Sequence, residues 1–189
     1  MLFQFHRAIR LFWQFSLVIS LWLGWGLSFA EETPNISEYQ VKATFLGRFG
    51  KYITYPKGAL DDSVSTFNLC ILGDDPFQGI LDVLVKDEMV KDRTIVVHYL
   101  RDVEKTGKCQ TLFISQSEEK QLVHILAYVK QQPILTVSDM NNFVTRGGMV
   151  QFYLLNNKVR FFIDPVTAGE AKLEVSSRLL QVAEVVRKE

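Results

Sequence analysis

The segment FNLCILGDDPF, residues 67–77, decides the fold class of this chain. Its first six residues form a short, mostly apolar run that predicts a strand, and the glycine and two aspartates then turn the chain. Asp75 is the predicted N-cap of a helix that has Pro76 at its first position and runs through Leu84. A strand that leads directly into a helix is typical of the units that build parallel sheets.

The residues before this segment predict a helix. Ser37, with Gln40 three residues later, matches a capping box, and apolar residues then recur at helical spacing. The helix is expected to end before Pro56, because the residue that precedes a proline avoids helical angles. Gly47 and Gly50 lie inside it, where a glycine costs about 0.5–1 kcal/mol relative to alanine.

The residues after this segment alternate between strand and helix patterns. Ser117 is the expected cap of a helix over residues 118–131, and a short helix is expected to begin at Ser138 and to stop at Gly147. The predicted strands of this region cover residues 94–99, 111–115 and 134–137.

The last part of the chain predicts a hairpin and a helix. Residues 149–155 and 159–163 flank Asn156-Asn157-Lys158, a turn that lacks the favoured Asn-Gly pair. Pro165 is expected to open one final helix with an apolar face made by Ala171, Val175, Leu179 and Val182. The whole pattern predicts a single-domain α/β sandwich: a mixed, mostly parallel sheet with helices on both faces and a C-terminal β-hairpin plus helix.

The first thirty residues have the three parts of a secretory signal peptide. Arg7 and Arg10 give a basic start, residues 11–27 are mostly apolar, and residues 28–30 place small side chains before the Glu31 bond. We expect a signal peptide over residues 1–30, cleavage between Ala30 and Glu31, and a mature domain over residues 31–189. The alternative is a retained membrane anchor, because the apolar run approaches the length of a spanning helix.

The composition limits the partners of the mature domain. Residues 31–189 carry 19 basic and 21 acidic side chains, so their net charge is −2. They contain no Lys/Arg cluster of the kind that nucleic-acid-binding proteins show. We therefore expect an exported domain that binds no nucleic acid.

The two cysteines, Cys70 and Cys109, predict a disulfide, because exported chains fold where such bonds persist. The bond would close a loop of about 40 residues, which the loop-entropy model values at about 4 kcal/mol. Two buried free thiols are the alternative.

No pattern for catalysis or cofactor binding stands out. Residues 73–79 lack the glycine spacing of a nucleotide-binding loop, and His98 and His124 have no partner at metal-ligand spacing. Asp74 and Asp75 form a carboxylate pair, but adjacent aspartates in a turn usually cap it or face solvent. We expect no enzyme activity, no cofactor and no metal; the alternative is a hydrolase that acts through Asp74 or Asp75.

Seven segments of the chain carry a resemblance to a known family: residues 38–46 with Pro56, 69–77, Cys109 with 112–115, 135–139, 147–150, 159–161 and 176–180. In this order they resemble the YfiR family of periplasmic proteins. The resemblance implies a non-catalytic repressor that binds the periplasmic sensor region of an inner-membrane diguanylate cyclase and lowers cyclic-di-GMP, the signal for biofilm formation. It also implies an outer-membrane protein that sequesters the repressor, and a homodimer.

The chain departs from the family pattern at a few positions. Phe162 stands where an acidic residue is common, and the second cysteine pair of some relatives is missing. The alternative function is an accessory or ligand-binding module of another envelope system, such as a sensor kinase or an outer-membrane transporter, since fold does not fix function.

The hairpin supplies the candidate partner-binding residues, because interface cores favour aromatic side chains and arginine. These are Phe152, Tyr153, Arg160 and Phe162. Alternate strand residues must face inward, so the sheet core is the alternative for at least half of them.

Overall fold

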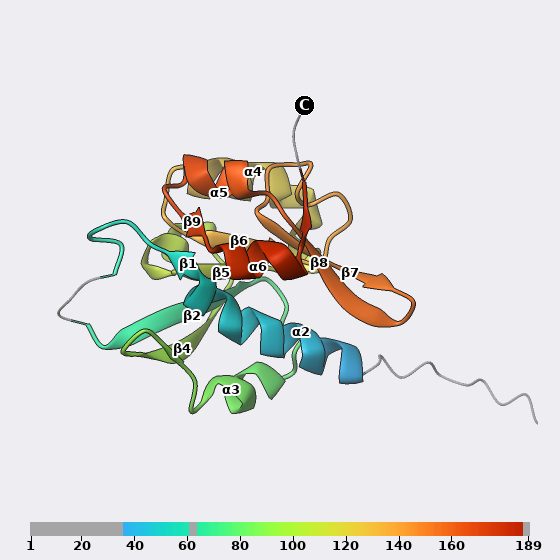
Figure 1. Cartoon of the computed structure of the whole chain (residues 1–189), viewed down its shortest axis with the longest axis horizontal. Helices are drawn as coiled ribbons and strands as arrows, with labels where there is room; N and C mark the ends of the chain where they lie inside the picture. The colour runs from blue at the N-terminus through green and yellow to red at the C-terminus, as the bar shows by residue number, and fades with distance from the viewer. Residues whose placement is uncertain (1–35, 61–63, 187–189) are drawn as a thin grey trace, which may run out of the picture. The chain divides into compact units, whose positions relative to one another are not determined.

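The computed structural model describes residues 36–60 and 64–186, in which helices alternate with strands (Figure 1). The helical elements are α2 (Ile36–Phe49), η1 (Gly50–Tyr52), α3 (Ile80–Val85), η2 (Val103–Lys108), η3 (Gln116–Gln121), α4 (Leu122–Val129), α5 (Pro165–Glu170) and α6 (Ser177–Val182). The strands are β1 (Ile53–Thr54), β2 (Thr66–Leu72), β3 (Met89–Val90), β4 (Arg93–Leu100), β5 (Thr111–Ile114), β6 (Leu135–Ser138), β7 (Val150–Leu155), β8 (Lys158–Ile163), β9 (Glu174–Val175) and β10 (Glu184–Val185).

The main sheet has the strand order β10-β8-β7-β6-β5-β2-β4-β3. The strands β4, β2, β5, β6 and β7 run parallel to one another, and β10 runs parallel to β8. The two antiparallel pairings are β7 with β8 and β3 with β4. The predicted fold class, a mixed and mostly parallel sheet in an α/β domain, is therefore confirmed.

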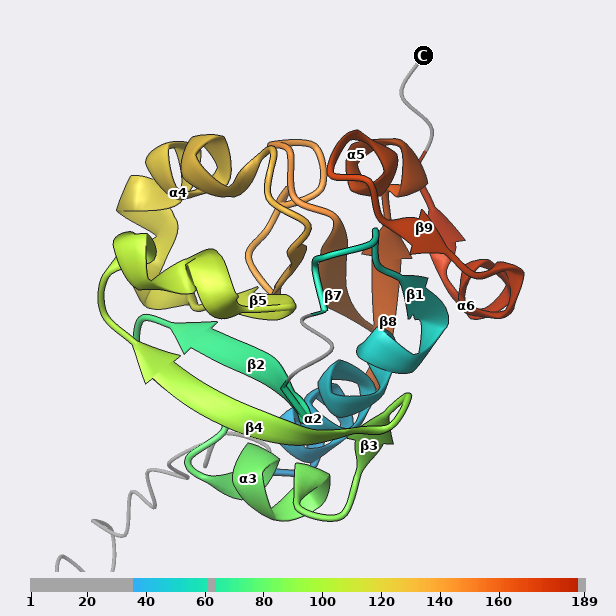
Figure 2. The same cartoon turned by 90° about the vertical axis from the view of Figure 1, so that its left-hand side faces the viewer.

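Helices cover both faces of this sheet (Figure 2). Neighbouring residues of β2 point to opposite faces, so Leu69 and Ile71 join one core cluster while Cys70 and Leu72 join the other. The first cluster also takes side chains from α2, α3 and α6, and the second takes them from α4. The short central strands are buried on both sides, as parallel strands require.

A disulfide joins Cys70 of β2 to Cys109, which follows η2, with 5.9 Å between their Cα atoms. The bond lies in the second core cluster and links β2 to the segment that leads into β5. The structure thus contains the predicted disulfide rather than two free thiols.

The first two helices differ from the prediction at their ends. Helix α2 begins one residue before Ser37, so this serine lies inside the helix rather than before it. It ends at Phe49, because the chain turns through η1 to place Ile53 on β1. Helix α3 starts at Ile80, because Asp75 accepts hydrogen bonds from the N–H groups of Phe77 and Gly79 and so holds a turn there instead.

The final helix was predicted wrongly as one element. The backbone of Lys172 is left-handed (φ 61°), which ends the helical path after α5. Strand β9 then pairs with β1, and the N–H of Ser176 donates to the carbonyl of Tyr52. Ser176 also caps α6 by accepting a hydrogen bond from the N–H of Leu179. Pairing with a distant strand therefore overrides the apolar helical spacing of this segment.

Two serines that were predicted to cap helices have other partners. The hydroxyl of Ser117 accepts the N–H of Asp74, and the helical path begins one residue earlier as η3. Ser138 accepts the N–H of Met140 and donates to the carbonyl of Ile114. The predicted short helix after Ser138 is wrong, since the chain makes turns there.

Gly47 has a packing role that the helix pattern hid. A Cβ atom at this position would lie 2.7 Å from Cγ1 of Val85, so glycine allows α2 to approach α3 closely.

The predicted signal peptide and its cleavage site at Ala30 and Glu31 lie outside the described residues. Within residues 36–60 and 64–186, no helix has the length and apolar character needed to cross a bilayer.

Candidate functional site

The β7–β8 hairpin projects beyond the strands beside it (Figure 1). Its turn residues Asn156 and Asn157 both have left-handed backbones, with φ of 50° and 58°, as a two-residue type I′ turn requires. Asparagine tolerates this conformation well, so the pair replaces Asn-Gly. Strand β6 pairs with β7 only at Val150 and Gln151, which leaves the outer part of the hairpin as a two-stranded ribbon.

One face of this ribbon carries three of the four candidate partner-binding residues. The rings of Tyr153 and Phe162 stack with their centroids 4.3 Å apart, and Tyr153 lies directly opposite Arg160. The hydroxyl of Tyr153 donates to Glu184 of β10. Partial burial, and then the hydrogen bond to this carboxylate, raise the pKa of Tyr153 to about 12. The hairpin face, Tyr153, Arg160 and Phe162, thus combines two half-buried aromatic rings with an exposed cation.

Phe152 lies on the opposite face of the ribbon and belongs to the core. Its side chain is 1% exposed, and its ring contacts Phe45 and Phe49 of α2 and Phe161 of β8. Phe152 is therefore one of the candidates that face the sheet core, the alternative considered in the sequence analysis. It packs beneath the hairpin and offers no surface to a partner.

A groove of about 430 Å³ separates α2 from α6. Its lining is apolar except for a threonine hydroxyl, a tyrosine hydroxyl and two arginines, and none of the described residues that line it is acidic. The lining residues are Val41, Thr44, Phe45, Arg48, Phe49 and Tyr52 on one side and Arg178, Leu179 and Val182 on the other. The sequence could not indicate this groove, because the residues of α6 were assigned to one long terminal helix with no known neighbour.

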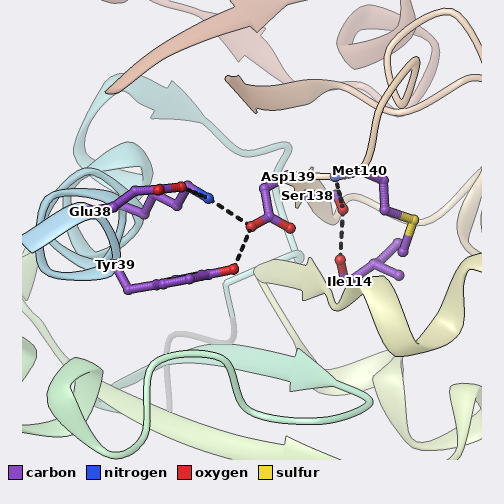
Figure 3. A network of polar contacts seen from close by, with 7 residues as sticks. Glu38, Tyr39, Ile114, Ser138, Asp139 and Met140 are labelled. Atoms are coloured by element: carbon purple, nitrogen blue, oxygen red, sulfur yellow. Dashed lines mark hydrogen bonds and ion pairs between the residues drawn. The ribbon is translucent and has the colours of Figure 1, made fainter. Parts of the chain in front are cut away.

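A buried polar network ties α2 to the carboxyl end of β6 (Figure 3). The ammonium of Lys42 lies 2.6 Å from a Glu38 oxygen and 2.7 Å from Oδ2 of Asp139. The hydroxyl of Tyr39 donates to the same Asp139 oxygen at 3.1 Å, and the ammonium lies 4.4 Å from the centre of the Tyr39 ring. Burial, and then the charge of Asp139, raise the pKa of Tyr39 above its ordinary value.

This network stabilises the contact between α2 and the end of β6 and lacks the features of a catalytic site. Lys42 and Asp139 satisfy each other, as charges that are removed from water must. Within residues 36–60 and 64–186, no serine, cysteine or histidine side chain bonds to Lys42 or Asp139. Sequence reasoning missed the pair because Lys42 lies on a helix and Asp139 in a turn nearly a hundred residues later.

Comparison with known proteins identifies the family of this chain. The sequence profile described as YfiR/HmsC-like matches residues 39–184, which is most of the chain. The protein belongs to the YfiR/HmsC-like family. A comparison with curated proteins gives no match.

The carboxylates considered for catalysis have structural partners in this YfiR/HmsC-like domain. Asp75 caps the turn before α3, and the exposed Asp74 pairs with Arg101. His98 contacts the side-chain oxygen of Asn68 at 3.0 Å, and His124 is exposed on α4. Among the residues that the structure describes, no three His, Cys, Asp or Glu side chains gather as a metal site would need.

Proposed function

We propose that this chain is a periplasmic regulatory binding protein that inhibits an inner-membrane diguanylate cyclase. It binds the periplasmic sensor region of the cyclase, holds the cytoplasmic enzyme inactive and so lowers cyclic-di-GMP. Membership of the YfiR/HmsC-like family over residues 39–184 is the observation that carries this proposal. The protein acts by binding and not by catalysis.

Inhibition of this kind is a shift between two states of the cyclase. A binding protein moves that equilibrium only by the difference in its affinity for the inactive and active forms. Changing a population from 1:99 to 99:1 requires a ratio of about 10⁴ between the two affinities. The protein must therefore make contacts with the inactive conformation of the sensor region that the active conformation does not offer.

The hairpin face is the proposed site of this contact. Stacked Tyr153 and Phe162 offer rigid aromatic surface, and Arg160 offers a charge that can pair with a carboxylate. Aromatic residues and arginine are enriched among the side chains that dominate binding energy. The proposal also includes a homodimer and an outer-membrane protein that sequesters the repressor and so releases the cyclase.

A binding experiment with a matched control tests this function. The mature protein is titrated with the periplasmic domain of a membrane cyclase encoded beside it, and cyclic-di-GMP is measured in cells with and without the gene. Tyr153→Ala is expected to weaken binding about tenfold or more and to raise cyclic-di-GMP. Tyr128→Ala, at an exposed tyrosine of α4, is the control and should change neither. Absence of binding together with unchanged cyclic-di-GMP on deletion would overturn the proposal.

Export is tested separately. The protein from a periplasmic extract is expected to begin at Glu31 and to lack residues 1–30. A full-length chain found in the membrane fraction would contradict cleavage after Ala30 and favour the retained anchor.

A further inference from the structure

Helix α2 exposes apolar side chains toward two neighbouring grooves. The α2–α6 groove described above lies on one side, and a second groove of about 560 Å³ lies on the other side against α3. Val41 and Thr44 line both, so the two grooves form one continuous surface across α2. We call this surface the α2 surface; it comprises the residues of the α2–α6 groove given above and, on the α3 side, Gln40, Ile80, Val83 and Leu84.

The exposure of this surface is unusual for a helix in a folded domain. A surface helix normally buries its apolar stripe and turns polar residues outward. Here Val41 is 41% exposed, Val83 of α3 is 75% exposed and Val182 of α6 is 62% exposed. Three elements thus present aliphatic side chains to the same two grooves, and exposed apolar patches of this kind mark binding surfaces.

The charges beside these side chains define the partner. Among the residues that the structure describes, the α2–α6 groove is lined by Arg48 and Arg178 and by no acidic residue, and the lining of the 560 Å³ groove is uncharged. Glu88 lies farther along the α2–α3 contact, in a smaller pocket that Arg48 also lines. Arg48 shares the carboxylate of Glu88 with Lys51, so two cations face one anion. The occupant that complements this surface has an apolar stripe with carboxylates beside it.

The shape of the surface favours a helix as the occupant. Both grooves run between helices and offer side chains, whereas an extended peptide needs the free backbone groups of a strand edge. An added helix packs its ridges of side chains into the groove between two others, as in helical layers. Fourteen residues of α2 give a length of about 21 Å, enough for an occupant of about four turns.

The geometry points to the α2 surface as the docking site of an acidic amphipathic helix from the protein partner. This inference rests on the proposed function in one respect, that the helix belongs to the periplasmic region of the cyclase. The α2 surface and the hairpin face are separate, because Phe152 and Phe161 lie on the α2 side of the hairpin and Tyr153 and Phe162 on the other.

A pair of matched variants tests the docking site. Val182→Glu adds a charge at an exposed position of the groove, and Val123→Glu makes the same change at a valine of α4 that is 74% exposed. Val182→Glu is expected to weaken binding of the cyclase domain about tenfold or more, and Val123→Glu to leave it unchanged. Binding that is equal for both variants overturns the docking site and leaves the proposed function standing. Equal melting temperatures establish that both variants fold.

A charge reversal and a model peptide separate the two proposals. Arg178→Glu is expected to weaken binding of an 18-residue helical peptide with a leucine stripe flanked by glutamates, and a version with lysines should bind Arg178→Glu better than wild type. Peptide binding without cyclase binding supports the docking site and overturns the proposed function. No preference between the two peptides overturns the docking site.

The same variants identify other occupants of the α2 surface. Binding to anionic phospholipid vesicles that Val182→Glu abolishes, without peptide binding, assigns the surface to lipid and overturns the helix. A wild-type dimer that Val182→Glu converts to a monomer in sedimentation assigns it to a second copy, which also overturns the inference.

Discussion

Lys42 of α2 and Asp139 at the carboxyl end of β6 form an ion pair of 2.7 Å with side chains that are only 5% and 4% exposed. The pair fastens the first helix of the domain to the centre of the sheet. Glu38, one helical turn before Lys42, adds a second carboxylate to the same ammonium. This buried contact therefore helps to fix the orientation of α2, and with it of the α2 surface, alongside the packing of Ala43, Leu46 and Phe49 in the first core cluster.

Removing one partner of this pair should be costly. Lys42→Met is expected to lower the free energy of unfolding by about 3–5 kcal/mol, because it leaves the Asp139 carboxylate buried without its cation. Urea denaturation at neutral pH measures the change. Lys86→Met, at an exposed lysine of the loop after α3, is the control. The double variant Lys42→Met/Asp139→Leu should recover much of the loss, and a double variant as unstable as Lys42→Met would contradict this account.

Loss of the disulfide should destabilise the domain through its unfolded state. Replacing Cys70 and Cys109 with alanine frees a loop of about 40 residues, at a cost of about 4 kcal/mol in the loop-entropy model. The native protein is also expected to weigh less than its reduced form by two hydrogen atoms. Thermal melting with and without a strong reductant makes the measurement; identical curves would show that the bond contributes nothing.

Two glycine-to-alanine variants should have opposite effects. A Cβ at Gly148 would lie 2.1 Å from the buried ring of Phe143, so Gly148→Ala should cost about 1–3 kcal/mol through overpacking. Nothing lies within 4 Å of a Cβ at Gly169 in α5, so Gly169→Ala should stabilise by about 0.4–1 kcal/mol. Chemical denaturation of both variants measures the change in the free energy of unfolding. Changes of the same sign in the two variants would contradict the packing argument.

The protein should lose stability in alkali. Burial raises the pKa of Tyr55 above its ordinary value, and its hydroxyl donates to the carbonyl of Gln110. In the unfolded chain the same group loses its proton near pH 10. Above that pH the unfolded state therefore binds fewer protons than the folded state, and stability falls as the pH rises.

Denaturation midpoints between pH 8 and pH 11 (roughly, on either side of the free tyrosine pKa) test this effect. Tyr55→Phe should show a smaller fall than wild type, and Tyr128→Phe, at an exposed tyrosine, should match wild type. A fall of equal size in all three proteins would exclude Tyr55 as a cause.

The fold was predictable where the sequence pattern and the tertiary structure agree. The sequence predicted the ends of β2, β4, β5, β6 and the hairpin strands to within one or two residues. Strands of this sheet show as short apolar runs, and the turns between them show as residue types, such as glycine, asparagine and aspartate, that favour turns. The terminal helix failed because β9 takes its hydrogen bonds from β1, a partner that local pattern cannot reveal. The predicted first residues of two helices were wrong because Asp75 and Ser117 accept hydrogen bonds from backbone N–H groups of the turn at residues 74–77 instead of capping those helices.

The candidate site was predictable in part for the same reason. Strand alternation predicted that some of the four hairpin candidates would face the core and left open which ones. The structure places Phe152 in the core and Tyr153, Arg160 and Phe162 on the other face. The α2 surface depends on the position of α6, and the Lys42–Asp139 pair depends on a contact between distant segments. Such features follow from the tertiary arrangement and not from any local sequence signal.

The pairing of β1 with β9 has a consequence for the order of folding. Strand β1 and the end of η1, which directly follow α2, contact the β9 segment near the end of the described chain through this pairing and through the bond from the N–H of Ser176 to the carbonyl of Tyr52. A chain that is still being made cannot close its first core cluster, because Leu173 and Leu179 arrive last. Contacts between such distant segments slow folding. Closure of the first core cluster is therefore a late step of folding, which waits until the β9 and α6 segments are available to pack against β1 and α2.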